Sequence, residues 1–268
     1  MIEHVVASLD GFQGSYVDVA ERRSWREVAG DGPAVVLLHG AFSGASSWSL
    51  QAGALAHEGF RVHVPERRGH AHTPDVDGPL SYAVMADETV AYLDAEVRGP
   101  AHLVGWSDGA VVALLVALRR PDLVAHMVLI GQYYNSSGRV PGGDLLRALR
   151  TEEAIASLQR DYAAVSPDGA DHFPVVHAKT MAMLDSEPEL DVATFGAVSA
   201  PTLVLQGDRD EVTLEHSAAV AAALGDGRLA VLPGTHGLPL ELPDVVNALL
   251  LSFLRTGAPA PAWSGASD

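Results

Sequence analysis

The sequence predicts an α/β fold with a mostly parallel central sheet, helices on both of its faces and an inserted helical lid. Short runs of aliphatic and β-branched residues alternate along the chain with longer stretches of helical periodicity, the pattern that strands and helices make in such folds. The connection between Ile130 and Pro201 is about 70 residues long, far beyond the loops of compact domains, so we expect it to carry structure of its own.

The composition narrows the class of protein. The chain has 268 residues, 48% of them hydrophobic and 19% charged, which suits one large globular domain with a sizeable core. A formal net charge of −17 argues against nucleic acid or an anionic membrane as partner, since both attract Lys and Arg. The absence of cysteine excludes a disulfide and a thiolate nucleophile. No leader-like N-terminus or bilayer-length apolar run is visible, so we expect a cytoplasmic protein that acts on a small molecule; the oligomeric state stays open.

Six apolar runs are predicted to be strands of a parallel sheet, because their length and continuous hydrophobicity suit burial on both faces. They are Ala34–Leu38, Arg61–Val64, His102–Trp106, Met127–Ile130, Thr202–Leu205 and Leu229–Leu232. The part of the chain up to Val28 contains two weaker candidates, which we expect to form an antiparallel edge.

Five segments between these runs show helical periodicity. They are Ser46–His57, Ser81–Val97, Ser107–Arg119, Leu214–Leu224 and Asp244–Leu254. Two further helical patterns, Asp144–Arg160 and Val175–Leu184, fall in the long connection. We therefore expect a core of residues 1–132 and 198–256, a helical lid or cap of residues 133–197, and a flexible Pro-, Gly-, Ala- and Ser-rich tail of residues 257–268.

The strongest chemical signal is the pentapeptide Gly105–Gly109, which fits G-x-S-x-G at the end of a predicted strand and the start of a predicted helix. In that context a sharp turn exposes the hydroxyl of Ser107, and the glycines remove side chains that would collide in the turn. The helix that begins there directs free N–H groups toward developing negative charge. The motif therefore predicts a nucleophilic serine.

With these motifs the chain resembles the α/β-hydrolase family over nearly its whole length, which implies the α/β-hydrolase fold. The family's chain order is nucleophile, acid, histidine. By this resemblance Ser107 is the nucleophile, Asp210 in the segment after Thr202–Leu205 is the acid, and His236 is the catalytic histidine. Asp208 is the alternative acid, followed by Glu211. In such a triad the imidazole takes the serine proton and the carboxylate fixes the imidazole.

The resemblance also implies an oxyanion hole. One donor is the backbone N–H of Asp108, and the second is that of Ala41 in a segment that looks like the family's H-G-x, with Phe42 in reserve. The loop of residues 65–70 resembles the family's P-D-x-x-G-x-G, with Glu66 in place of Asp, and is interpreted as a structural brace. His70 and His72 are weak candidates for a metal pair, and no phosphate loop is present, so we predict neither metal nor cofactor.

These features predict a serine hydrolase that cleaves a small carboxylic ester or lactone through an acyl-enzyme. Phe42, Trp106 and Phe173 are the candidate substrate-binding residues, and Met181 and Met183 are further candidates in the lid. Alternatives on the same triad are amide hydrolysis, carbon–carbon bond hydrolysis and cofactor-free perhydrolysis. A non-catalytic protein that binds a small ligand is the alternative from another class.

The pentapeptide is similar to that of valacyclovir-hydrolase-like members, which also carry G-W-S-D-G. In those members an acidic residue near the nucleophile is associated with recognition of a substrate amino group. By this resemblance the Asp108 side chain is a candidate for the same role. The simpler interpretation is that Asp108 stabilises the first turn of its helix.

Overall fold

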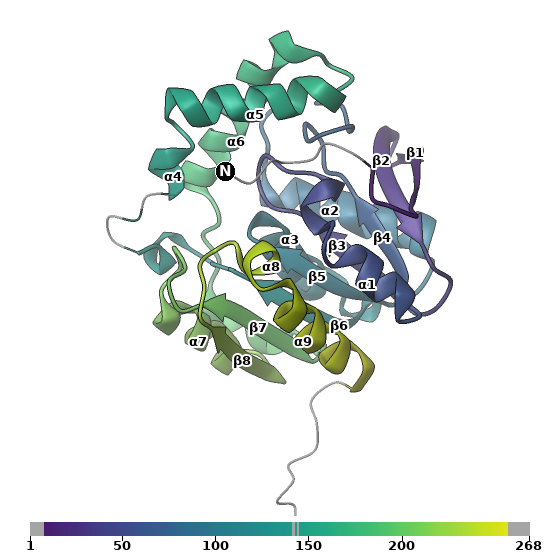
Figure 1. Ribbon diagram of the computed structural model, residues 1–268. Helices are drawn as coiled ribbons and strands as arrows, with labels where there is room; N and C mark the ends of the chain where they lie inside the picture. The colour runs from purple at the N-terminus through teal and green to yellow at the C-terminus, as the bar shows by residue number, and fades with distance from the viewer. Residues whose placement is uncertain (1–7, 141–142, 144, 257–268) are drawn as a thin grey trace, which may run out of the picture.

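Eight strands form a single sheet in the computed structural model, which describes residues 8–140, 143 and 145–256 (Figure 1). The strands are β1 (Gln13–Val19), β2 (Arg22–Ala29), β3 (Ala34–Leu38), β4 (Arg61–Pro65), β5 (Ala101–Trp106), β6 (Val124–Ile130), β7 (Thr202–Gly207) and β8 (Gly227–Leu232). Their order is β1-β2-β4-β3-β5-β6-β7-β8; β3 to β8 pair in parallel, while β1 and β2 form an antiparallel edge. This confirms the predicted fold class. The predicted flexible tail lies outside the described residues, as does Asp144.

Apolar side chains point alternately to the two faces of the central strands. In β3, Val36 packs into the core on one face and Leu37 into the core on the other, and both are fully buried. The prediction of burial on both faces is wrong for β8, where Leu229 and Val231 are 39% and 43% exposed. β8 is the last strand of the sheet and pairs only with β7, so part of its surface faces solvent.

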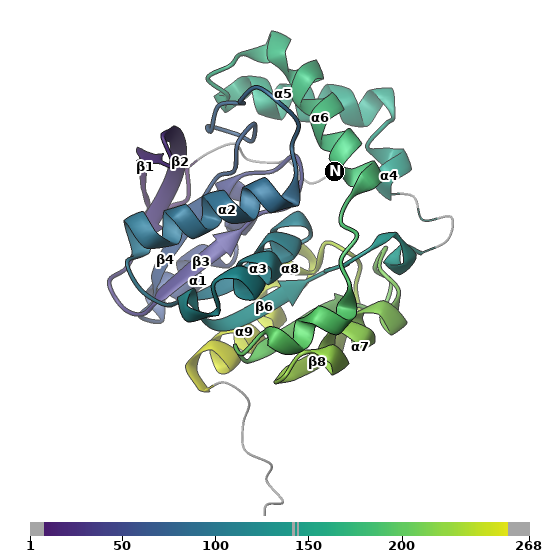
Figure 2. The same cartoon turned by 180° about the vertical axis from the view of Figure 1, so that it is seen from behind.

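Helices cover both faces of the sheet (Figures 1 and 2). On one face lie α1 (Ala52–His57) and α9 (Pro243–Thr256); on the other lie α2 (Tyr82–Tyr92), α3 (Asp108–Arg119) and α7 (Leu214–Ala223). The short α8 (Leu238–Glu241) follows β8 and was not predicted. The pattern predicted over Ser46–His57 is divided into a 3-10 turn, Ala45–Trp48, and α1. In the described part of the chain, no helix is long and apolar enough to cross a bilayer.

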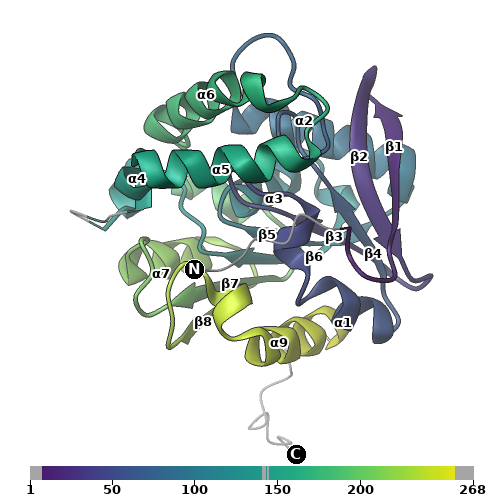
Figure 3. The ribbon, with the colours of Figure 1, turned by 45° about the horizontal axis from the view of Figure 1, so that its top comes forward.

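The described part of the connection between β6 and β7 holds three α-helices, α4 (Leu145–Ala148), α5 (Glu152–Val165) and α6 (Phe173–Ser186), besides short 3-10 turns. They lie together beyond the carboxyl ends of the strands (Figure 3). The single pattern predicted over Asp144–Arg160 is divided because Thr151 has an extended backbone and its hydroxyl caps α5 by accepting the Ala154 N–H at 3.3 Å. We call α4, α5 and α6 the inserted helices.

A buried carboxylate ties the inserted helices to the core. Asp75, in the loop before α2, accepts hydrogen bonds from Lys179 Nζ at 2.6 Å and from His172 Nε2 at 2.9 Å. Its side chain is only 4% exposed, so these contacts are shielded from solvent. The backbone N–H of Asp75 also donates to Asp168 Oδ2 at 2.7 Å. Polar contacts as well as apolar packing therefore hold α6 in place.

Candidate active site

Ser107 stands at the turn between β5 and α3, with φ 57° and ψ −120°. A side chain in this left-handed region is strained, and such strain persists only where surrounding contacts enforce it. The Ser107 N–H donates to the carbonyl of Ile130 in the neighbouring strand at 2.8 Å, which helps to fix the turn. The conformation is that of the sharp strand-to-helix bend that the motif predicts.

Two glycines allow this bend. A Cβ on Gly105 would lie 2.3 Å from the Gly109 carbonyl oxygen, and a Cβ on Gly109 would lie 1.9 Å from the Leu38 carbonyl oxygen. Both distances are far inside van der Waals contact, so a side chain at either position would push α3 away from the sheet. The glycines of the motif thus act through close backbone approach.

The predicted oxyanion donors, Ala41 and Asp108, line one cavity together with Ser107. Asp108 is the first residue of α3, where backbone N–H groups have no acceptor within the helix. The segment before Ala41 passes close to the nucleophile, since a Cβ on Gly40 would lie 3.3 Å from Cβ of Ser107. Residues from two separate elements therefore line one cavity with Ser107, and their backbone N–H groups stay the predicted oxyanion donors.

The segment before Ala41 is held by buried polar groups. The Arg67 N–H donates to Nε2 of His39 at 3.1 Å, so the imidazole proton lies on Nδ1, which is 2.8 Å from the Gly40 carbonyl oxygen. Burial, with the charge of Arg67, holds the pKa of His39 well below its usual range, so the ring is neutral. The Arg67 guanidinium also donates to the Gly40 carbonyl at 3.0 Å. His39 and Arg67 thus both contact the Gly40 carbonyl and hold this segment in place.

Asp210 and His236 lie in contact in the loops that follow β7 and β8. Nδ1 of His236 is 2.8 Å from Oδ1 of Asp210, and the Asp210 side chain is 1% exposed. Burial alone would lower the pKa of His236, but the hydrogen bond and charge of Asp210, with smaller effects of Asp108 and Glu211, raise it above 6.5. The alternative acid, Asp208, accepts the Gly234 N–H at 2.9 Å in an exposed turn.

The other ring nitrogen of His236, Nε2, makes no hydrogen bond with the residues described. It is buried, and His236 lines the same cavity as Ser107. Gly131, at the end of β6, lies against this ring with φ +59°; a Cβ there would be 2.8 Å from Nδ1 and Cε1. The His236 ring is therefore held by Asp210 on one side and packs against the backbone of Gly131 on another.

The Asp108 carboxylate is fully buried beneath the cavity. Oδ1 accepts the Tyr82 hydroxyl at 2.7 Å, and that hydroxyl is 3.1 Å from the hydroxyl of Tyr133. Burial raises the pKa of Asp108, and the Arg67 charge and the Tyr82 hydrogen bond oppose this effect. Oδ2 of Asp108 has no partner within the described structure. One oxygen of a residue that lines the cavity is thus without a donor among the residues described.

The cavity at Ser107 has a volume of about 160 Å³. Leucines and valines of the inserted segment and β7–α7 connection form its apolar side: Val140, Leu145, Leu146, Leu149, Leu184 and Val212. Arg139, whose guanidinium carbon is 5.5 Å from the centre of the Tyr133 ring, and Glu211 supply charge. A mostly apolar cavity with a few polar groups is typical of a small-molecule site.

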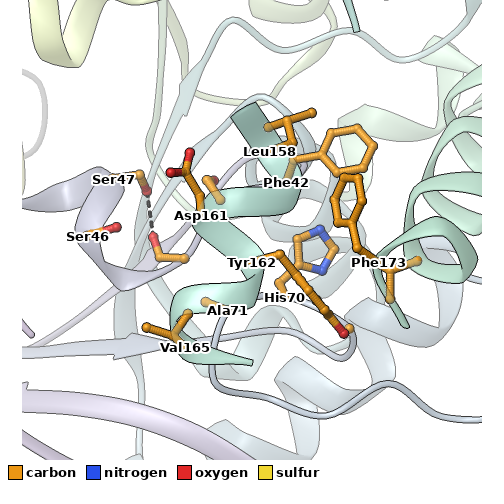
Figure 4. A pocket seen from close by; sticks show the side chains of 14 residues that line it. Phe42, Ser46, Ser47, His70, Ala71, Leu158, Asp161, Tyr162, Val165 and Phe173 are labelled. Atoms are coloured by element: carbon orange, nitrogen blue, oxygen red, sulfur yellow. Dashed lines mark hydrogen bonds between the residues drawn. The ribbon is translucent and has the colours of Figure 1, made fainter. Parts of the chain in front are cut away.

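The three predicted substrate-binding residues lie outside this cavity. Phe42 and Phe173 line a second cavity beneath α5 and α6 (Figure 4). The Trp106 indole donates to the His236 carbonyl at 2.8 Å and packs edge-on against Trp48, so it supports the histidine loop. Met181 and Met183 are buried. The sequence analysis did not predict that leucines in and around α4 line the cavity. Helical periodicity was visible there, but it does not show which side of the helix faces Ser107.

The loop of residues 65–72 braces the site. Glu66, at the position where the resembling family has Asp, accepts the N–H groups of Ala45 at 3.0 Å and His72 at 2.7 Å. It therefore joins the start of the 3-10 turn to the loop. Oxygens of Glu66 also lie within 3.3 Å of Nδ1 of His72, whereas Nδ1 of His70 faces the Arg68 carbonyl, so the two histidines have separate partners.

Comparisons with known sequences agree on one family. The pattern of the Alpha/beta hydrolase family matches residues 35–249. A putative carbamate hydrolase RutD of Variovorax paradoxus is 32% identical over 257 residues, covering 85% of this chain and 94% of that protein. A 2-hydroxy-6-oxo-6-phenylhexa-2,4-dienoate hydrolase of Burkholderia cepacia is 29% identical over 271 residues, covering 85% of this chain and 90% of that protein.

Solved structures share the fold. A meta-cleavage product hydrolase of Pseudomonas fluorescens superposes with a TM-score of 0.72 at 21% identity, covering 90% of this chain and 97% of its own. An enol-lactonase of Burkholderia xenovorans gives a TM-score of 0.71 at 20% identity, covering 90% and 100%. At these identities the likeness shows the arrangement of the elements alone.

Proposed function

Since this chain belongs to the alpha/beta hydrolase family, we propose that it is a serine hydrolase that cleaves small carboxylic esters or lactones with Ser107, His236 and Asp210. Relatives named as hydrolases support a hydrolytic enzyme. The observation that carries the finer proposal is the contact of 2.8 Å between Asp210 and His236, made beside a cavity that Ser107 also lines.

Acylation begins when His236 Nε2 takes the Ser107 proton. The serine oxygen forms a bond to the substrate carbonyl carbon, and the N–H groups of Ala41 and Asp108 bind the oxyanion. The tetrahedral intermediate then collapses, the bond to the leaving oxygen breaks, and His236 returns its proton to that oxygen. Asp210 stays ionised throughout and stabilises the imidazolium.

Deacylation repeats these steps with water. His236 takes a proton from a water molecule, whose oxygen attacks the acyl carbon, and the acid leaves as the Ser107 hydroxyl regains its proton. The apolar side of the 160 Å³ cavity suits an acyl chain, because its leucines and valines stabilise hydrocarbon there. In this proposal the inserted helices act as the lid that forms this wall.

A narrower version is hydrolysis of α-amino esters. It is favoured by the buried Asp108 carboxylate, whose Oδ2 has no partner among the residues described and which lines the catalytic cavity. An ammonium group on the substrate would supply the missing donor. The test compares an α-amino ester with its des-amino analogue in wild type and Asp108→Ala. If the wild type does not prefer the amino ester, or Asp108→Ala keeps the preference, the narrower version is wrong.

Labelling with a serine-directed fluorophosphonate tests the nucleophile. We expect one covalent adduct on folded wild type, located by peptide mass spectrometry at Ser107. Ser107→Ala should lose both the adduct and nearly all turnover. Ser43→Ala, in the neighbouring loop, is the matched control and should keep the label. Absence of a label on folded wild type would favour a non-catalytic binding protein.

A substrate panel tests the reaction class. It contains butanoate esters, a small lactone, an anilide and a carbamate, together with a meta-cleavage product, since relatives are named for carbamate and dienoate substrates. The proposal requires kcat/KM to be highest on an ester or lactone. Highest turnover on the carbamate, the anilide or the meta-cleavage product would replace the ester proposal with that chemistry while keeping the family.

A further inference from the structure

A second cavity lies beside the catalytic one, between the inserted helices and the core. Its volume is about 70 Å³. From the core come Phe42 to Ser47 and the turn Gly69–Ala71; from α5 and α6 come Tyr162, Phe173 and Val176, among others (Figure 4). It is smaller than a cavity of about 150 Å³ that holds benzene, so a short chain of a few atoms fits it.

Neighbouring residues of one loop line the two cavities. Ala41, the proposed oxyanion donor, lines the catalytic cavity, and the next residue, Phe42, lines the second. Phe42 has φ +54°, and its ring stacks on His177 of α6 at 5.3 Å between centroids. The loop that carries the proposed oxyanion donor therefore contributes to both cavities. An ester has two substituents on its carbonyl carbon, the acyl chain and the alkoxy group.

His70 lines the second cavity and has a hydrogen-bond acceptor without a partner in the described part of the chain. Its Nδ1 is 2.9 Å from the Arg68 carbonyl oxygen, which can only accept, so Nδ1 carries the proton. Burial and the Arg67 charge lower the pKa of His70 to about 3, which keeps the ring neutral. Nε2 is then a lone-pair acceptor, buried and without a partner among the described residues. Figure 4 shows this ring beside Tyr162 and Phe173.

Three further residues of this cavity offer acceptor oxygens, and the Ser46 hydroxyl can donate or accept. The Ser43 and Ser47 hydroxyls donate to the carbonyls of Gly40 at 2.9 Å and Gly44 at 2.8 Å, which leaves their oxygen lone pairs unused by these bonds. The Asp161 carboxylate of α5 is half-buried in the lining. These acceptors favour a ligand that brings its own O–H or N–H.

We propose that the second cavity is the leaving-group subsite and that it takes a short alcohol carrying a second hydroxyl, with that hydroxyl donating to Nε2 of His70. This rests on the proposed ester hydrolysis. The acyl chain then occupies the leucine-lined cavity, and the alkoxy oxygen departs on the Phe42 side with the proton from His236. No further reactant is required, since the subsite only binds.

Four butanoate esters provide the test: methyl, propyl, 2-hydroxyethyl and 2-methoxyethyl. Propyl and 2-hydroxyethyl have the same number of heavy atoms and differ in one terminal donor. Wild type should prefer 2-hydroxyethyl to both propyl and 2-methoxyethyl by about three- to tenfold in kcat/KM, the effect of one neutral hydrogen bond. His70→Asn, whose amide still can donate to the Arg68 carbonyl but is too short to replace Nε2, should lose this preference.

A second test asks whether the second cavity holds the alcohol group, by filling the cavity with a larger side chain. Val176 of α6 is 2% exposed and lines it, whereas the adjacent Val175 is 44% exposed. Val176→Phe should lower kcat/KM at least tenfold for propyl and 2-hydroxyethyl butanoate and leave methyl butanoate within twofold of wild type. Val175→Phe is the matched control and should leave all four unchanged. If Val176→Phe fails to fold, Val165→Phe at the α5 side of the same cavity replaces it.

The failures are distinct. Equal loss on all four esters, or no loss on any, in a folded filling variant would overturn the subsite. Retention of the 2-hydroxyethyl preference in His70→Asn would overturn the role of His70. Wild type that hydrolyses methyl butanoate without distinguishing among the alcohols removes the subsite and keeps the proposed function. Wild type inactive on every ester removes both.

Discussion

The hydroxyl of Tyr82 donates a hydrogen bond of 2.7 Å to Oδ1 of Asp108, the residue that follows the proposed nucleophile. This contact joins α2 to the first residue of α3 across 26 positions of sequence. It leaves a fully buried carboxylate with one satisfied oxygen, next to a backbone N–H that we assign to the oxyanion hole. A negative charge at this place requires compensation, and the nearby cation is Arg67.

We expect Arg67→Met to lower stability by roughly 1–3 kcal/mol, since the buried carboxylate of Asp108 loses the charge that opposes its desolvation. Arg67→Met/Asp108→Asn should regain much of that loss, because the double variant no longer buries a carboxylate without its cation at this position. Urea unfolding of wild type, both single variants and the double variant gives the coupling energy. Strictly additive effects would show that Arg67 acts only by holding the Gly40 carbonyl.

Asp210→Asn should lower kcat by roughly 10⁴-fold, because an amide cannot hold Nδ1–H of His236 and stabilise the imidazolium in the same way. Asp208→Asn is the matched control, since Asp208 binds the Gly234 N–H in an exposed turn and does not contact the ring. Steady-state kinetics on the best ester of the panel measures both. A silent Asp210→Asn together with an inactive Asp208→Asn would reassign the acid.

The pH profile of kcat/KM should decline on the acid side with an apparent pKa above 6.5. His236 must be neutral to accept the serine proton, and the contact with Asp210 raises its pKa above that value. Asp108→Asn removes one of the charges that raise this pKa, so the acid limb should move to lower pH. A profile that is flat from about pH 5 to 8 contradicts the role of His236.

Gly131→Ala should reduce kcat strongly with little change in the secondary structure of the protein. Its Cβ would lie 2.8 Å from the His236 ring, and φ +59° strains any side chain. The control is Gly53→Ala in α1, where the Cβ meets nothing within 4 Å and alanine favours the helix. Kinetics and far-ultraviolet circular dichroism separate the two effects. Full activity in Gly131→Ala would mean that the ring has room to shift.

Asp75→Asn should loosen α6 at neutral pH. The Lys179 and His172 contacts outweigh burial and lower the pKa of Asp75 below 3.8, so its contribution is present above 3.8 and is lost as the pH falls through the lower folded value. Amide exchange of α6 should quicken in the variant. Asp185→Asn, which removes an exposed ion pair with Arg150, should leave exchange in α6 unchanged. Equal exchange in all three proteins would exclude the tie to the core.

The sheet was predictable because its signals are local. The continuous apolar composition of Ala34–Leu38 predicts a strand whose side chains are buried on both faces of the sheet. The turn at Ser107 is predicted by the glycines on either side of the serine. The antiparallel edge formed by β1 and β2 also agrees with its prediction. The burial of β8 was overestimated because exposure depends on the place of a strand in the sheet, which its composition does not reveal.

The walls of the cavities were less predictable because they depend on the direction in which helices are packed. Phe42 and Phe173 were expected to bind substrate at Ser107, yet they lie in the neighbouring cavity, since Phe42 turns toward α6 at a positive φ. Arg67 belongs to the loop predicted to brace the site, but its partner was not predicted. Its buried contact with Gly40 arises because β3 and β4 are neighbours in the sheet, and no local sequence pattern predicts that pairing.

The inserted helices leave and rejoin the sheet at adjacent strands. β6 ends at Ile130, which pairs with Leu205, whereas β7 begins at Thr202, which pairs with Met127, so the connection leaves at the carboxyl edge of β6 and returns at the amino edge of the neighbouring β7. Lengthening or shortening such a segment costs only about 0.6 kcal/mol per doubling of its length in closure entropy. The whole segment can therefore be replaced, by evolution or by design, to change substrate specificity while Ser107, Asp210 and His236 keep their positions.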